Sequence, residues 1–169
     1  MSPDDRTIAT PGGAFTWVAR AEARLAAVVP TWLVQLALRL GLAIPFWRSG
    51  INKWDGFLQL NDVAVLLFQS EFRLRVPGGP YPFPAPGVVA FLSGSAEILL
   101  PILLVLGLFT RFAALGLLAM TAIIQLTVPE GWPVHATWAA MALGLIAWGP
   151  GGIALDRLRP AAPVIRPVW

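Results

Sequence analysis

Four apolar stretches dominate the sequence and restrict the folds that are open to it. They run from about Pro30 to Trp54, Pro86 to Phe109, Phe112 to Val128, and Val134 to Trp148. The first two exceed the length of about 20 apolar residues that a helix needs to cross the hydrocarbon of a bilayer, and the other two are a few residues shorter. Hydrophobic residues make up 57% of the chain and charged residues 12%, against a charged share of roughly 25% in soluble domains. The sequence therefore predicts an integral membrane protein.

Helices are the expected spanning elements, because isolated strands leave backbone groups unpaired in lipid and these stretches do not alternate as barrel strands do. Only Thr110 and Arg111 separate the second stretch from the third. So short a connection makes those two helices antiparallel neighbours. The predicted fold class is all-α: an integral membrane four-helix bundle with an N-terminal interfacial helix and a long outer loop between its first two helices.

Three segments are expected along the chain. Residues 1–29 form a cytoplasmic N-terminal segment, residues 30–150 a domain of four transmembrane helices, and residues 151–169 a cytoplasmic tail. The first segment has no continuous apolar core after a basic start, so it does not resemble a cleavable signal.

An amphipathic helix is predicted from Phe15 to Val29, with a broad apolar face and with Arg20 and Arg24 on the opposite side. Such a helix suits the cytoplasmic membrane interface. Glu22 interrupts the apolar face, so a plain continuation of the first transmembrane helix stays open as an alternative.

Basic residues predict the orientation. With four spans, seven arginines fall on the side of the termini and three basic residues on the other side, so both termini are expected in the cytoplasm. The net charge of +3 and the pI near 10.6 describe this bias. They do not indicate nucleic-acid binding. The two groups are Arg6, Arg20, Arg24, Arg111, Arg157, Arg159 and Arg166, and Lys53, Arg73 and Arg75.

Two charged residues fall deep within the predicted spans. Arg39 lies about nine residues, or about 14 Å, from the inner end of the first helix, and Glu97 about eleven residues, or about 16 Å, from the outer end of the second. An unpaired ion at such depth costs several kcal/mol, so we expect Arg39 and Glu97 to form a buried pair. The pair either fixes the helix register or handles protons for a ligand, in which case both residues are candidate catalytic groups. A protonated Glu97 that is hydrogen-bonded to Ser93 is a competing state.

A polar cluster is predicted near the outer end of the first helix, within FWRSGINKWDGF at residues 46–57. Arg48 is expected to face the bundle and Lys53 to reach water. For His135 an interface role is favoured over a ligand role, because metal sites need several clustered ligands. The candidate ligand-binding residues of this polar mouth are Arg48, Asn52, Lys53, Gln125, His135 and Trp138.

The outer loop, from Asp55 to Ala85, is expected to pack on the bundle. FLQLNDVAVLLFQ has helical character, whereas the prolines of PGGPYPFPAPG exclude a helix there. The loop either covers a cavity between the helices as a lid or does no more than pack.

FWRSGINKW, the long loop and GSAEILLPILLVLGLFTRFAAL together resemble the DoxX family of small bacterial membrane proteins. In that family a basic residue ends the first helix, an acidic residue lies in the second, and a Gly-x-x-Thr-Arg turn enters the third. Lys53, Glu97 and Arg111 match these positions. The resemblance covers about residues 33–150 and implies a multi-pass protein of the bacterial inner membrane. By analogy it also implies a place beside redox enzymes such as thiosulfate:quinone oxidoreductase.

Three function classes stay open. The first is an accessory or quinone-interacting subunit of a membrane redox complex, in which Arg48 or Asn52 polarises a quinone carbonyl and Glu97 exchanges protons. The second is a non-catalytic assembly or scaffold protein. The third is a transporter of small solutes or protons, against which stand the small size and the lack of evident inverted repeats.

Independent catalysis is not expected, because the chain has no cysteine, one histidine and no dinucleotide-binding motif. Redox chemistry would belong to a bound quinone or a partner. Neither a metal nor a haem is indicated. The expected partners are membrane lipid and another protein subunit or a second copy of the chain, not nucleic acid.

Overall fold

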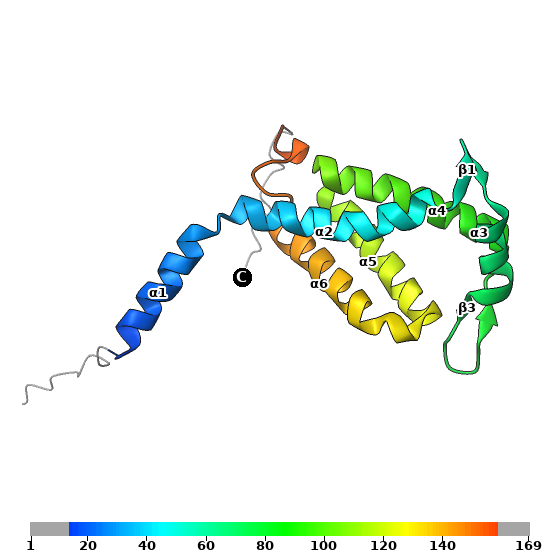
Figure 1. The fold of residues 1–169 in the computed structure, drawn as a ribbon, viewed down its shortest axis with the longest axis horizontal. Coiled ribbons are helices and arrows are strands. Elements are labelled where there is room, and N and C mark those ends of the chain that lie inside the picture. The colour runs from blue at the N-terminus through cyan, green and yellow to red at the C-terminus, as the bar shows by residue number, and fades with distance from the viewer. Residues whose placement is uncertain (1–13, 159–169) are drawn as a thin grey trace, which may run out of the picture. The chain divides into compact units, whose positions relative to one another are not determined.

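The structure, a computed structural model, describes residues 14–158, and most of these residues are helical (Figure 1). Residues 1–13 and most of the predicted tail lie outside this range. Three of the arginines used to predict the orientation, Arg6, Arg159 and Arg166, therefore lie outside it as well. The α-helices are α1 (Ala14–Val28), α2 (Thr31–Ile51), α3 (Asp62–Leu66), α4 (Pro86–Leu106), α5 (Thr110–Thr127) and α6 (Trp132–Trp148).

Helix α1 forms a unit of its own, and the second unit begins at Trp32. The helix occupies nearly the residues that were predicted, and Arg20 and Arg24 are exposed. Its place at the membrane interface stays a prediction, as do the domain boundaries.

Helices α4 and α5 are each long and apolar enough to cross a membrane, and α1 and α2 taken together supply a third candidate span. Helix α6 has 17 residues. The structure is therefore that of a mostly helical protein with two or three candidate spans. Four spans with both termini in the cytoplasm stay a prediction.

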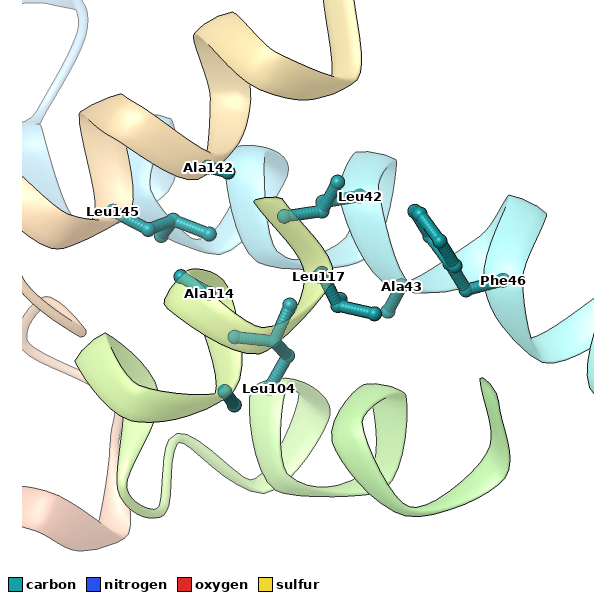
Figure 2. Close-up of a cluster of buried hydrophobic side chains, with 9 residues drawn as sticks. Leu42, Ala43, Phe46, Leu104, Ala114, Leu117, Ala142 and Leu145 are labelled. Carbon is teal, nitrogen blue, oxygen red and sulfur yellow. The ribbon is translucent and has the colours of Figure 1, made fainter. Parts of the chain in front are cut away.

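Helices α2, α4, α5 and α6 share one core, in which small side chains alternate with larger ones. Figure 2 shows leucines from these helices meeting alanines of their neighbours. Small residues let helices approach closely, which is how helices associate in lipid. The core residues are Leu42, Ala43, Phe46, Leu104, Ala113, Ala114, Leu117, Ala142 and Leu145.

The turn between α4 and α5 depends on local backbone chemistry. Gly107, with a left-handed φ of 66°, caps the C-terminal end of α4, and Leu108 N–H donates to the carbonyl of Leu103. Glycine adopts this conformation without the steric cost of a Cβ. The carboxylate of Asp156 then accepts from the N–H groups of Phe109 at 2.8 Å and Thr110 at 2.9 Å, which caps α5.

Residues 52–85 lie at the end of the core where α2 ends and α4 begins, here called the loop end. They contain two antiparallel hairpins, β1 (Trp54–Gly56) with β2 (Gln59–Leu60) and β3 (Arg73–Leu74) with β4 (Tyr81–Pro82). Between the hairpins, α3 continues into one π-helical turn, Leu67–Glu71.

Three hydrogen bonds order this segment and fix it to α5. Asn61 caps α3 by accepting from Ala64 N–H at 2.6 Å, and its amide donates to the carbonyl of Asn52 at 2.7 Å. Arg75 N–H donates to the carbonyl of Leu126 at the end of α5. The first two bonds lie within the segment, and the third holds it against the end of α5.

Candidate ligand cavity

Glu97 in α4 forms an ion pair with Lys53, which follows α2, and not with Arg39 as predicted. Lys53 Nζ lies 2.5 Å from Glu97 Oε2 and donates to Ser49 Oγ at 2.9 Å. Ser93, one turn before Glu97, donates to Glu97 Oε1 at 3.1 Å. Glu97 is 4% exposed. The buried carboxylate thus has the charged partner that its burial requires.

Arg39 is buried as expected, at 2% exposed, but its guanidinium binds backbone carbonyls. Nη1 donates to Pro150 at 3.0 Å and to Ile153 at 2.5 Å, while Nη2 donates to Val105 at 2.8 Å. The predicted Arg39–Glu97 pair is therefore wrong. Instead, Arg39 fastens the segment after α6 to the last turn of α4.

The register of α2 against α4 explains the difference. Arg39 lies beside Val105 in the last turn of α4, whereas Glu97 packs against Gly50. Gly50 is eleven residues beyond Arg39, which corresponds to roughly 16 Å along a helix. The predicted depths place the start of α2 level with the end of α4. In the structure α2 begins about two turns before the level at which α4 ends.

A cavity of about 420 Å³ lies between α2, α4, α5, α6 and the loop segment. The polar side chains of Lys53, Glu97, Ser49 and Ser93 all belong to its wall, and the remaining wall is largely aliphatic and aromatic. The aromatic rings that line it are those of Phe46, Phe68, Phe72, Phe83 and Trp138. The loop segment, for which a lid or simple packing was expected, contributes three of these rings, those of Phe68, Phe72 and Phe83.

Arg48 was predicted to face the bundle, but it is exposed and does not line the cavity. Asn52 is exposed as well. With 3.6 residues per turn, the inward face of α2 runs through Phe46 and Ser49 and continues to Lys53, and Arg48 lies off this face. Lys53, which was expected to reach water, instead has a side chain that is only 14% exposed.

Gln125 and His135 lie together at the loop end, as predicted, but neither lines the cavity. His135 Nδ1 is 2.8 Å from Gln125 Oε1, and the Gln125 amide donates to the carbonyl of Pro129 at 3.1 Å. Trp138 does line the cavity, and it packs on both His135 and Phe46 with ring centroids 5.3 and 5.1 Å apart. His135 and Gln125 therefore brace α5 against α6 and support the position of Trp138.

The Lys53–Glu97 pair and the phenylalanine wall were not predicted from the sequence. The spacing of Phe46, Ser49 and Lys53 by three and four residues was the signal for a shared helix face. No such signal marks Phe68, Phe72 and Phe83, because their convergence depends on the tertiary path of the loop.

Apolar helices around one core, with a single ion pair in the wall of an aromatic cavity, define the class of this chain: a small helical membrane protein. Residues 34–130, more than half of the chain, match the DoxX family model, and the chain belongs to the DoxX family. The resemblance found in the sequence is thereby confirmed. Neither a curated protein nor a solved structure matches the chain.

Proposed function

We propose that this DoxX-family protein binds a quinone in its cavity and serves as a membrane component of a redox complex. The observation that carries the proposal is the Lys53–Glu97 pair in the wall of an otherwise apolar, aromatic cavity. Pockets with mostly apolar walls and a few convergent polar groups are typical of ligand sites. The family's association with quinone-linked oxidoreductases suggests which ligand is held.

The walls suit a flat ring that carries carbonyl groups. Five aromatic side chains offer faces and edges for stacking, which favours a planar ligand over a globular one. The volume of about 420 Å³ lies within the range of about 300–1,000 Å³ that small-molecule pockets occupy.

Lys53 supplies the donor for a ligand carbonyl. An ammonium group has three N–H donors, and Nζ uses two of them on Glu97 and Ser49 Oγ at 2.5 and 2.9 Å. Its third contact, with the Ser49 carbonyl at 3.4 Å, is the longest. A ligand carbonyl replaces that weak contact at little cost, and it takes the role that the sequence analysis gave to Arg48 or Asn52.

Glu97 holds the position of a proton relay beside that carbonyl. Ser93 and Lys53 orient its two oxygens, so that Oε2 lies next to the group that binds the carbonyl. A bound quinone would supply two-electron redox chemistry: it would take two electrons from a partner oxidoreductase and two protons drawn from water, one of which Glu97 would relay.

Extraction in mild detergent tests this function. Lipids and proteins that copurify with the chain are identified by mass spectrometry, and we expect a near-stoichiometric quinone that is lost from Glu97→Gln and Lys53→Met proteins. Arg75→Gln and Glu130→Gln are the matched controls, since these residues form an exposed ion pair at 3.1 Å outside the cavity. A stable protein partner without quinone would instead support the assembly role, and solute flux in proteoliposomes without either would support transport.

A further inference from the structure

Three phenylalanine rings of the loop segment pack together at the loop end of the cavity. Phe68 is 7% exposed, and its ring contacts those of Phe72 and Phe83 with centroids 5.1 and 5.6 Å apart. All three rings line the cavity. The loop segment thus gives the cavity an aromatic wall at this end, where Val128, which is 38% exposed, also lines it.

Between α4 and α5, part of the cavity wall is exposed apolar surface. Leu92 of α4 and Ile123 of α5 both line the cavity, yet their side chains are 61% and 48% exposed. Each belongs to an exposed apolar row on its own helix, a surface that faces hydrocarbon in a membrane protein. The rows are Val88, Leu92 and Leu99 on α4, and Leu115, Ile123 and Leu126 on α5.

This exposed part of the wall lies below the helix ends. Leu92 is six residues inside α4, which corresponds to about 9 Å along the helix axis, and Ile123 is four residues before the end of α5. Both side chains are aliphatic, so the gap between them suits an alkyl or isoprenoid chain and offers nothing to a polar one. The polar groups of the site, Lys53 and Glu97, belong to the inner wall.

The volume of the cavity also limits what it holds. About 420 Å³ is near the lower end of the range for drug-sized ligands. That space accommodates a substituted ring but not a long chain attached to it. A chain that stays in the hydrocarbon avoids transfer into water, which would be unfavourable for every methylene.

We propose that the ligand is a tailed, membrane-resident amphiphile: it enters through the gap between Leu92 and Ile123, its ring stops at Lys53 and Glu97, and its tail remains in the lipid. This inference rests on the proposed function and specifies the chemical class of the ligand and its route. A water-soluble ring without a tail binds the same wall but makes no use of the gap.

Binding of two tritiated probes to the full chain in lipid nanodiscs tests the route. The probes are a benzoquinone with a decyl tail and the same benzoquinone without a tail. Leu92→Trp and Ile123→Trp place a large ring in the gap. We expect each to raise the Kd of the tailed probe by at least about ten-fold, since losing contact with a couple of methylenes suffices for that factor. The Kd of the tail-free probe should not change.

Leu99→Trp is the matched control, because Leu99 is 60% exposed on the same row of α4 and does not line the cavity. It should leave both Kd values unchanged. Equal weakening of both probes by the gap variants, or no weakening of the tailed probe, overturns the lateral route while quinone binding stands. If wild-type protein binds neither probe, or Lys53→Met leaves tail-free binding intact, the proposed function itself fails and the route with it.

Discussion

Gly50 of α2 lies directly against the backbone of Glu97 in α4. A Cβ placed on Gly50 would lie 3.0 Å from the carbonyl carbon, the carbonyl oxygen and the Cβ of Glu97. This close approach brings Lys53, three residues further along, within ion-pair distance of the Glu97 carboxylate. The separation of the two helices therefore controls the polar wall of the cavity.

Gly50→Ala should push α2 away from α4 and weaken the polar wall. The added methyl group meets backbone rather than a flexible side chain, so the contact cannot be relieved by a rotamer change. Overpacking of this kind typically costs about 1–3 kcal/mol. We expect a lower unfolding temperature in detergent and a loss of retained quinone. Gly87→Ala is the control, since a Cβ at Gly87 meets nothing within 4 Å. Equal behaviour of the two variants would show that the close approach is unimportant.

Removing one member of the Lys53–Glu97 pair should destabilise the protein more than removing both. A single substitution leaves a buried charge without its partner, which costs on the order of 3–5 kcal/mol for a buried pair. The double variant, Lys53→Met with Glu97→Gln, leaves no unpaired ion. Chemical unfolding of the four proteins in a double-mutant cycle gives the coupling energy.

The exposed pair between Arg75 and Glu130 provides the reference for this cycle. Its side chains are 55% and 70% exposed, and exposed pairs contribute only about 0–1 kcal/mol. A coupling energy for Lys53 and Glu97 no larger than that of Arg75 and Glu130 would mean that the cavity pair behaves as a surface pair. Burial of the pair would then contribute nothing to its coupling energy.

Arg39 is expected to hold the segment after α6 in place. Its guanidinium bridges the carbonyls of Pro150 and Ile153 to that of Val105, and a Cβ on Gly107 would lie 2.7 Å from Nη1. Lysine has a single nitrogen and cannot reproduce this planar arrangement of donors. Arg39→Lys should therefore speed amide hydrogen exchange in residues 149–158, as mass spectrometry of the peptides would report.

Arg48→Lys is the matched control for Arg39→Lys, because it makes the same chemical change at an exposed position of the same helix. It should leave exchange in residues 149–158 at the wild-type rate. Unchanged exchange in Arg39→Lys as well would show that the segment is held by its other contacts.

The sequence predicted the helices well because apolar length is a local property. The second helix was expected from Pro86 to Phe109 and extends from Pro86 to Leu106, and the fourth was expected to end at Trp148, where α6 ends. Charge burial was also foreseen, since both Arg39 and Glu97 are buried. These conclusions needed only hydropathy and the cost of desolvation.

Pairing could not be predicted in the same way, because it depends on the relative shift of two helices. A shift of about three turns, the eleven residues from Arg39 to Gly50, makes Lys53 the partner of Glu97 in place of Arg39, and neither residue type nor spacing reveals that shift. The close approach at Gly50 and the carbonyl cradle after Gly149 determine it, and both are tertiary features. The cavity depends on the same register, so its lining could not be derived either.

Asp156 should stabilise α5 through its two bonds to the helix start. Its oxygens accept separately from the N–H groups of Phe109 and Thr110 at 2.8 and 2.9 Å, and the negative charge also interacts favourably with the helix N-terminus. Asparagine has a single acceptor oxygen, so Asp156→Asn can keep only one of the two bonds. The expected loss is about 1 kcal/mol, the usual contribution of a helix cap, measured as a lower unfolding midpoint.

Asp55→Asn is the control for the cap, because it removes the same charge from an exposed residue at the loop end. It should shift the unfolding midpoint little. Phe109 has a positive φ of 50°, a conformation that is costly for a bulky residue, so the bond from its N–H to Asp156 offsets part of a local strain. If Asp156→Asn unfolds at the same midpoint as Asp55→Asn, the turn must hold that conformation through packing alone.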